Sequence, residues 1–259
     1  MQASARCAFL IASSTLSGPP MSKRSRRLLA LSAVGVGLWL IVYVGNDALR
    51  QLESDAPSES LGQTNNGSLV NGKRLPSSGP GFATYSRLGS LLGRTATHHR
   101  VRDAVLDAYA AVYAEHPEVT LLYGETGWPS GGSFRPHRTH QNGLSVDFMV
   151  PVLRAGEPDV LPTHVFTKWG YGIDFDDDGQ NGDLAIDFEM LAEHLHQLDL
   201  ATQAHGLTIE VVILAPSLQD ELAATERGAE ITQRLRFSRN PSWVRHDDHI
   251  HVDFRVVET

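Results

Sequence analysis

The sequence predicts an α+β fold: a small, largely antiparallel β-sheet with helices packed on it, preceded by one apolar N-terminal helix. Three observations predict this arrangement: an uncharged, mostly apolar run at residues 28–45, two long segments with helical spacing of apolar residues, and several short β-rich segments between and after them. A few strands that alternate with helices, without an internal repeat, are typical of this class. A chain of 259 residues is long enough for one such domain and an N-terminal extension.

The N-terminal region is interpreted as a membrane anchor. The run 28–45 can just cross a bilayer as a helix, and it is longer than the apolar core of most cleaved signal peptides, which are the alternative. An uncleaved signal anchor is therefore expected. Since the basic side chains precede the run, the positive-inside rule places residues 1–27 in the cytoplasm and the domain on the other side of the membrane. Met21 begins a more typical basic leader, so residues 1–20 are interpreted as an overlong start.

Charge and cysteine content exclude several classes of function. The chain has a formal net charge of −8, and because the leader is basic, the remainder is more acidic still. An acidic domain lacks the basic face that nucleic-acid binding requires, so no nucleic-acid partner is expected. The single cysteine, Cys7, lies in the leader, and no Ser-x-x-Lys motif occurs. The exported part therefore has no disulfide, no thiol nucleophile and no serine nucleophile of that kind.

The rest of the chain divides into a linker and a domain. Residues 46–81 are rich in Ser, Gly, Asn and Pro and lack periodicity, which predicts a flexible linker before a domain at 82–259. Apolar spacing and end signals then predict helices at 100–115, 187–205 and 217–224, and strands at 119–123, 144–150, 208–214 and 249–257. A glycine-rich loop at 124–132 follows the first of these strands, and loops of that kind commonly frame a site.

Two short segments, 137–147 and 246–251, contain five of the twelve histidines. In a strand, alternate side chains share a face, so Asp147 lies opposite the apolar set of its strand. By the same rule His249, His251 and Asp253 lie together, opposite Ile250, Val252 and Phe254. If the two strands are neighbours, one carboxylate and two imidazoles converge, and His140 can join them from a loop that turns at Gly143.

This group of side chains suits a catalytic zinc site. Such a site needs three nitrogen or oxygen ligands and an open position for a water molecule that the metal activates. His140, Asp147 and His251 would supply the ligands for one catalytic Zn²⁺. His249 is our candidate for the group that takes the proton of the water and returns it to the leaving amine.

A His-x-His pair alone is weak evidence, since histidines often lie on surfaces without a metal. The chain contains a second such pair, His194 and His196, within the predicted helix 187–205. Residues two apart on a helix do not face each other, so we assign this pair to a solvated helix surface. The strand pair is distinguished from it by the upstream His-x-x-Gly-x-x-x-Asp segment in the same domain.

At these residues the chain resembles a group of zinc peptidases that includes lysostaphin-type enzymes, D-alanyl-D-alanine metallocarboxypeptidases and penicillin-insensitive murein endopeptidases. They share His-x-x-x-x-x-x-Asp followed by His-x-His. The resemblance is strongest to the penicillin-insensitive murein endopeptidase family, because His137 and His246 are also present and Gly-x-Pro-x-Gly-Gly-x-Phe occurs at 127–134. It extends over residues 68–254.

The resemblance implies a hedgehog-like peptidase fold and hydrolysis of D-alanyl-diaminopimelate cross-links in peptidoglycan stem peptides. It implies that His140, Asp147 and His251 bind zinc and that His249 is catalytic. His137 and His246 would be further active-site histidines, and His137 could instead join a second, weaker metal site. The chain departs from the family in lacking disulfides, in its anchor and in its divergent middle segment 151–239, which affects substrate preference more than zinc chemistry.

Two other functions are compatible with the same motifs. A D-Ala-D-Ala carboxypeptidase or dipeptidase of the same zinc group would trim stem ends, and a catalytically inactive, metal-stabilised module would only bind the cell wall. One further motif, the acidic segment 174–183, begins like an EF-hand loop, but position twelve is Ala185 instead of the Glu that completes calcium coordination. We expect an acidic surface turn, with a calcium-stiffened loop as the alternative.

Overall fold

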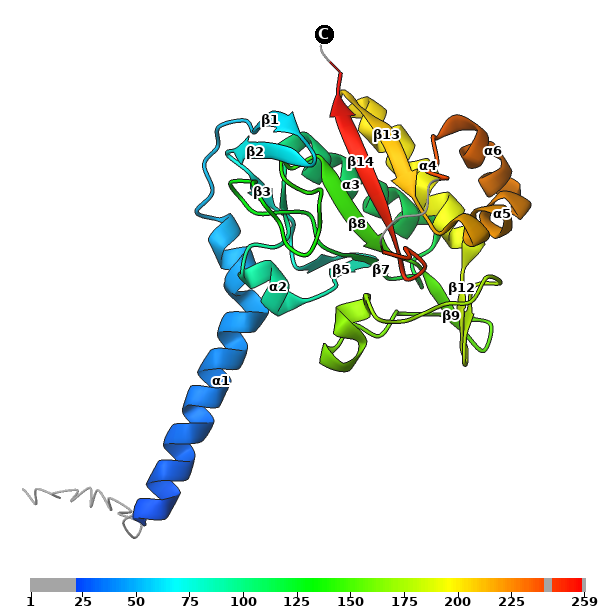
Figure 1. The fold of residues 1–259 in the computed structure, drawn as a ribbon. Helices are drawn as coiled ribbons and strands as arrows, with labels where there is room; N and C mark the ends of the chain where they lie inside the picture. Colours follow the sequence, from blue (N-terminus) through cyan, green and yellow to red (C-terminus); the bar gives the residue numbers. More distant parts are fainter. Residues whose placement is uncertain (1–21, 240–243, 258–259) are drawn as a thin grey trace, which may run out of the picture. The chain divides into compact units, whose positions relative to one another are not determined.

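The computed structural model describes residues 22–239 and 244–257 (Figure 1). It divides into two compact units, residues 1–39 and 40–259. The predicted overlong start at 1–20 and Cys7 lie outside the described residues. Among the described residues, α1 (Lys23–Arg50) is the one helix long and apolar enough to cross a membrane, with a mean hydropathy of 2.2 over its most apolar window.

The prediction of a flexible linker over residues 46–81 is wrong for most of its length. The last turns of α1 belong to the second unit, where the buried Asn46 side chain donates hydrogen bonds to Leu75 O at 2.9 Å and to Ser77 Oγ at 3.1 Å. The Ser, Gly and Asn residues of this segment form tight turns and side-chain hydrogen bonds between short strands. These are β1 (Glu59–Gln63), β2 (Asn66–Val70), β3 (Lys73–Arg74) and β4 (Ser78–Gly79).

A six-stranded sheet forms the centre of the second unit (Figure 1). Its order is β13-β14-β8-β7-β5-β4, and all neighbours are antiparallel except β5 and β7. The predicted α+β class with a largely antiparallel sheet is confirmed. Besides β4, the strands of this sheet are β5 (Phe82–Thr84), β7 (Leu121–Tyr123), β8 (Ser145–Met149), β13 (Leu207–Ile213) and β14 (His249–Val256).

Two long helices, α3 (His99–Glu115) and α4 (Phe188–Ala204), cover one face of this sheet. Phe148 of β8 contacts Tyr109 of α3 and His194 of α4, with ring centroids 6.3 and 4.9 Å apart. The apolar face of β8 and β14 is therefore in the core, as the alternation of side chains along each strand predicts. Asp187 caps α4 by accepting the N–H of Met190, which explains why this helix begins where the sequence predicts.

The assignment of His194 to a solvated helix surface is wrong. His194 is buried and stacks on Tyr109 at 5.4 Å between ring centroids, and neither ring nitrogen has a hydrogen-bond partner among the described residues. The imidazole lies on the core face of α4, where it packs against the rings of Tyr109 and Phe148. His196 lies two positions on and is half-buried.

Short elements frame the main sheet. A four-stranded sheet has the order β10-β9-β12-β11, and β3 pairs with β6. Two helices follow β13, and α2 and the 3-10 segment η1 lie in the loops around the site. Their bounds are α2 (Arg87–Leu91), β6 (Ala96–Thr97), β9 (Val152–Arg154), β10 (Glu157–Asp159), η1 (Val165–Gly170), β11 (Gln180–Asn181), β12 (Leu184–Ile186), α5 (Pro216–Ala224) and α6 (Glu226–Arg234).

The acidic segment 174–183 forms a turn that leads into the β11–β12 hairpin. Asp176 Oδ1 accepts the backbone N–H groups of Asp178 and Gln180 at 3.1 and 2.8 Å. Ala185, at the position where an EF-hand has its bidentate Glu, pairs with Gln180 inside the hairpin. The hydrogen bonds of Asp176 account for the shape of this turn.

Candidate active site

The pairing of β8 with β14 brings the two sequence motifs together. The strands are antiparallel, with His251 directly opposite Asp147 and Asp253 directly opposite Ser145. These side chains lie on the face away from α3 and α4, as predicted from alternation along each strand. His251 Nδ1 is 2.9 Å from Asp147 Oδ1.

His140 reaches the same carboxylate from the loop before β8. Its backbone has a φ of 67°, and Gly143, which turns the chain into the strand, has a φ of 75°. His140 Nε2 lies 3.2 Å from Asp147 Oδ1, and the rings of His140 and His251 have centroids 4.7 Å apart. The structure therefore brings together the three side chains predicted as zinc ligands.

The donor set fits a metal ion. His140 is completely buried, and its Nδ1 has no hydrogen-bond partner among the described residues, while its Nε2 lies 3.2 Å from Asp147 Oδ1 without hydrogen-bond geometry. Leaving a buried polar atom unpaired is expensive, and a bound cation would remove that penalty. Ligand atoms of a tetrahedral zinc ion lie about 3.3 Å apart, close to the 2.9 and 3.2 Å that separate the imidazole nitrogens of His251 and His140 from Asp147 Oδ1.

The electrostatics of Asp147 also favour a cation. The side chain is fully buried, and burial alone would raise its pKa. The neighbouring imidazoles of His140 and His251 outweigh that effect and hold the pKa of Asp147 well below its usual range. The carboxylate is therefore ionised and needs a positive partner in this site.

Asp253 supports His251 from the side away from Asp147. Its Oδ1 is 2.9 Å from His251 Nε2 and 2.5 Å from Ser145 Oγ, which donates to it. A carboxylate on the far nitrogen of an imidazole fixes the tautomer and orientation of a metal-binding histidine. In this arrangement His251 Nδ1 is the nitrogen that faces Asp147.

His137 is a fourth imidazole beside Asp147. A second possible metal site consists of His137, His140 and Asp147. Each of these residues offers one ligand atom, and the three atoms lie within 4.8 Å of one another. His137 Nδ1 is 3.8 Å from Asp147 Oδ2, farther than the nitrogens of His140 and His251 are from Oδ1. Its Nε2 is 2.7 Å from Glu125 Oε2.

Glu125 is held by a network that the sequence did not predict. It accepts hydrogen bonds from Tyr85 Oη at 2.7 Å and from Arg94 Nη2 at 2.8 Å, and Arg94 Nε makes a second contact. Burial raises the pKa of Glu125, but the hydrogen bonds from Arg94 and His137 outweigh burial and lower it to about 2. Burial lowers the pKa of His137, but its partners Glu125 and Asp147 outweigh that effect and raise it above its ordinary value.

Tyr171 connects the two carboxylates. Its hydroxyl donates to Asp147 Oδ2 at 3.0 Å and accepts the backbone N–H of Glu125 at 2.8 Å. Its ring lies 4.8 Å from that of His249, edge to face. Tyr171 therefore fixes the second oxygen of Asp147 and forms one wall beside His249.

His249 and His246 lie side by side, with ring centroids 4.7 Å apart. His249 Nδ1 is 2.5 Å from Asp248 Oδ1, which leaves Nε2 as its second ring nitrogen for other partners. His246 Nδ1 is 2.9 Å from Val244 O, and burial, together with the nearby His249, lowers the pKa of His246 to about 4. His246 is therefore a neutral imidazole at neutral pH.

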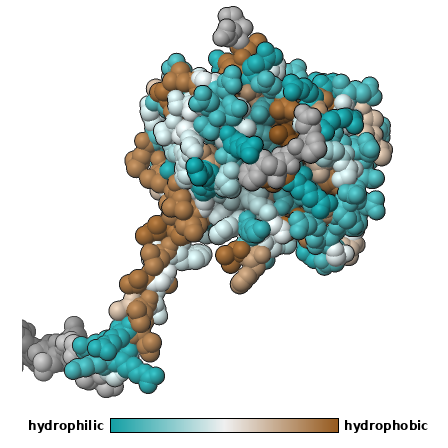
Figure 2. Space-filling view, in the orientation of Figure 1, coloured by the Kyte–Doolittle hydropathy of each residue, from teal (hydrophilic) through white to brown (hydrophobic). Residues whose placement is uncertain are grey.

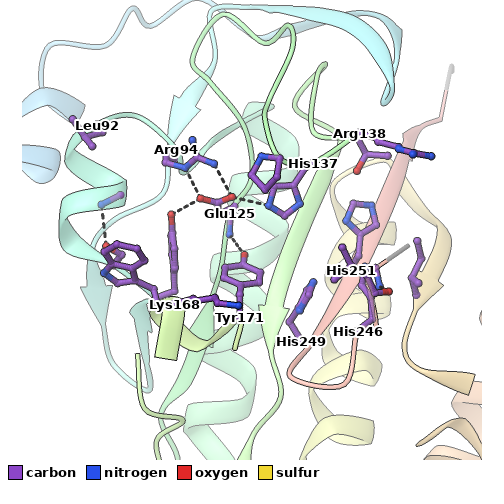
Figure 3. Close-up of a pocket in the computed structure, with 18 of the residues that line it drawn as sticks. Leu92, Arg94, Glu125, His137, Arg138, Lys168, Tyr171, His246, His249 and His251 are labelled. Atoms are coloured by element: carbon purple, nitrogen blue, oxygen red, sulfur yellow. Dashed lines mark hydrogen bonds and ion pairs between the residues drawn. The ribbon is translucent and has the colours of Figure 1, made fainter. Parts of the chain in front are cut away.

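A cavity of about 680 Å³ is lined by the outer groups of this site, namely Glu125, His137, Tyr171, His246, His249 and His251 (Figure 3). Figure 3 shows Glu125 on one wall, bound by Arg94 and His137, with His246, His249 and His251 on the opposite wall. The lining also includes apolar and basic side chains from α2 and the residue that follows it, from the loop 136–139 and from η1: Leu88, Leu92, Arg138, Lys168 and Trp169. A cavity of this size can hold several residues of a peptide.

The structure brings together all six histidine and aspartate residues predicted for the site. Sequence reasoning missed Glu125, Tyr171, Arg94 and the pairing of Asp248 with His249. Glu125 lies in the glycine-rich loop that the sequence marked as framing a site, and Asp248 stands next to the predicted catalytic histidine. Tyr171 lies in the divergent middle segment, where no motif marked it.

The chain matches a known protein family over most of its length. A family model described as penicillin-insensitive murein endopeptidase matches residues 60–258, which include every residue of this site. The curated proteins searched include no match to the chain. The match covers well over half of the chain and agrees with the resemblance seen in its two histidine motifs. The chain belongs to the penicillin-insensitive murein endopeptidase family.

Proposed function

We propose that this protein is a zinc-dependent endopeptidase that hydrolyses the peptide cross-links of peptidoglycan. The observation that carries the proposal is the convergence of His140 and His251 on the buried carboxylate of Asp147. Family membership supports a substrate in murein.

His140, Asp147 and His251 would hold the ion. Zinc bound to them would supply Lewis acidity, which makes water nucleophilic near neutral pH and polarises the scissile carbonyl. No acyl-enzyme is needed for this chemistry, so the activity would be insensitive to penicillin. His137 would complete the site next to these ligands, with a second, weaker metal site as its alternative role.

His249 would act as the general base and then as the general acid. Its Nδ1 is bound to Asp248, which holds the ring and stabilises the imidazolium that forms when Nε2 takes a proton. The same nitrogen would then deliver the proton to the leaving amine. His246, held by Val244 O, packs against this ring and would keep it oriented toward the cavity.

The domain would work in the periplasm, anchored to the inner membrane by α1. The apolar helix and the basic residues before it support this placement. The burial of Asn46 in the second unit also supports an uncleaved anchor, because cleavage after the apolar run would disturb a packed part of the domain.

Digestion of purified cross-linked muropeptide dimers by the full chain tests the proposal. We expect conversion of dimers into monomers, inhibition by a chelator, and recovery of activity when zinc is added. A His116→Ala variant, altered at the C-terminal end of α3, serves as the control and should remain active. Absence of new products with zinc present would overturn the proposal.

Product analysis distinguishes the other two functions. Release of terminal D-alanine from monomers, with dimers left intact, would assign the chain to the carboxypeptidases of the same zinc group. Wall binding that survives a His249→Ala change, with no turnover by the unaltered protein, would assign it to the binding modules.

A further inference from the structure

The anchor helix joins the catalytic unit without a spacer. Within residues 40–259, Asn46 is bound to Leu75 and Ser77, and Asp47 Oδ1 accepts the N–H of Ser77 at 3.1 Å. Arg50 Nε donates to Arg74 O at 3.2 Å. Given the proposed anchoring, these contacts would hold the domain next to the bilayer.

Helix α2 packs against this end of α1. Arg87 Nη1 donates to Tyr43 O at 2.9 Å, and its guanidinium carbon lies 4.0 Å from the centre of the Tyr43 ring. Gly45 is so close to Leu91 that an added Cβ would lie 2.7 Å from Leu91 Cδ1. The side chains of α2 that point away from the domain therefore lie next to the C-terminal end of the apolar run 28–45.

The exposed side chains next to this junction are apolar. Leu88 and Leu92 of the α2 region are exposed, and Leu92 has 62% of its surface accessible. The 3-10 segment η1, which lines the same cavity with Lys168 and Trp169, exposes Val165, Trp169 and Phe166, the last 92% exposed. Figure 2 shows η1, which is yellow-green in Figure 1, as a hydrophobic projection from the domain.

The backbone of η1 is held in an unusual conformation that supports this display. Lys168 and Trp169 are consecutive non-glycine residues with φ of 49° and 58°, in the left-handed region. Such strain persists only where the surroundings enforce it, and it often marks a functional segment. Thr167 Oγ1, which donates to Pro162 O at 2.7 Å, helps to fix the turn.

We propose that η1 and the exposed side of α2 form a membrane-docking surface that rests on the lipid bilayer next to the anchor. Phe166, Val165 and Leu92 would enter the interfacial layer. Lys168 and Arg87 would lie at the level of the headgroups, as basic side chains commonly do next to aromatic residues at a membrane interface. The cavity, which residues of α2 and η1 both line, would then face peptide held close to the membrane.

This inference rests on the anchoring part of the proposed function. The test therefore measures membrane insertion of the anchor and docking of η1 separately. The full chain with Cys7→Ser is reconstituted in phospholipid vesicles, and single cysteines at Phe166, Trp39 or Val257 carry a spin label. Accessibility is measured to oxygen, which concentrates in lipid, and to a water-soluble nickel chelate. Val257 is the control because it is an exposed apolar residue beyond the end of β14 that is remote from His249.

We expect labels at Phe166 and Trp39 to show an oxygen-to-nickel accessibility ratio several-fold above that at Val257. A label at Phe166 that matches Val257, while the label at Trp39 is in lipid, would overturn docking and leave the anchor intact. Water-exposed labels at both Trp39 and Phe166 would overturn the anchor and docking together. A label at Phe166 that is in water but becomes protected when stem peptide is added would overturn docking in favour of a substrate contact.

Discussion

Asp147 is the residue on which the contacts of the site converge. Its Oδ1 faces His140 and His251, and its Oδ2 accepts a hydrogen bond from Tyr171. A fully buried carboxylate with this many partners is stable only when positive charge compensates it. Protonated imidazoles can provide that charge, and a zinc ion shared with the neutral imidazoles can provide it as well.

The proposed role of His249 leads to a prediction about turnover. His249→Ala should lower hydrolysis of cross-linked muropeptides roughly 10²–10⁴-fold, the range that general acid–base catalysis contributes. The zinc content, measured by atomic emission, should stay the same because His249 is not a proposed ligand. Loss of zinc together with activity would instead identify His249 as a ligand, and undiminished turnover would place the base elsewhere.

The hydrogen bond between Asp253 and His251 leads to a prediction about metal affinity. Asp253→Ala should weaken zinc binding roughly 10–100-fold, because the carboxylate orients the ring and increases its basicity. Competition with a chromogenic chelator measures this change. Asp183→Ala, altered in a surface ion pair with Arg154, is a matched control that should bind zinc normally. An unchanged affinity in Asp253→Ala would show that Asp253 does not position a metal ligand.

At the scale of elements, two strands and two helices determine where the site lies. The pairing of β8 with β14 places the histidines on the face that looks away from α3 and α4. On the covered face, His194 of α4 is packed between Tyr109 and Phe148. The same two strands thus separate a polar site from a core that contains one unpaired imidazole.

The burial of His194 predicts acid sensitivity. Burial lowers the pKa of His194 to about 4, from 6.5 in an exposed imidazole. The unfolded chain therefore binds a proton as the pH falls below about 6.5, while the folded chain does not until about pH 4, so stability is lost over that interval. We expect roughly 2 kcal/mol less stability at about pH 5 than at about pH 7 from this residue.

Urea unfolding of the wild type and of His194→Phe measures this contribution. Phenylalanine fills a similar volume among aromatic rings and does not titrate. The variant should therefore lose less stability than the wild type between the two pH values. Equal losses in the two proteins would show that His194 is solvated or paired in the folded state.

The sequence predicts the strands of the site well because its signals there are local. Alternation of apolar and polar residues along residues 144–150 and 249–257 indicates which side chains share a face, and both faces proved correct. The strands between residues 59 and 79 were missed because they are short and held by distant contacts, such as the hydrogen bond from Ser60 Oγ to Asn142 O at 2.8 Å. Neither the alternation of apolar and polar residues nor the amino-acid composition predicts such contacts.

The side chains around the predicted ligands were harder to predict for a similar reason. Glu125 and Tyr171 act through partners that are far away in the sequence, as in the bond from Tyr85 to Glu125. His194 was misassigned because its His-x-His spacing on a helix indicates nothing about which face is buried. Tertiary packing decided that point.

At the scale of the whole molecule, the last turns of α1 are a structural part of the second unit. Asn46→Leu removes hydrogen bonds to Leu75 and Ser77 and leaves their buried acceptors unpaired. We expect a loss of about 1–3 kcal/mol in stability, which is the usual cost of such groups. Thermal unfolding of the detergent-solubilised full chain measures it, and an unchanged transition would mean that the helix end is not packed in the domain.

The most direct test of the central claim is an anomalous difference map from zinc-containing crystals of the protein, recorded at the zinc absorption edge. We predict one peak at ligand distance from His140, Asp147 and His251, with one coordination position open to the cavity. A peak held by other residues, or a shell closed by His137 as a fourth protein ligand, would contradict the proposed catalytic site.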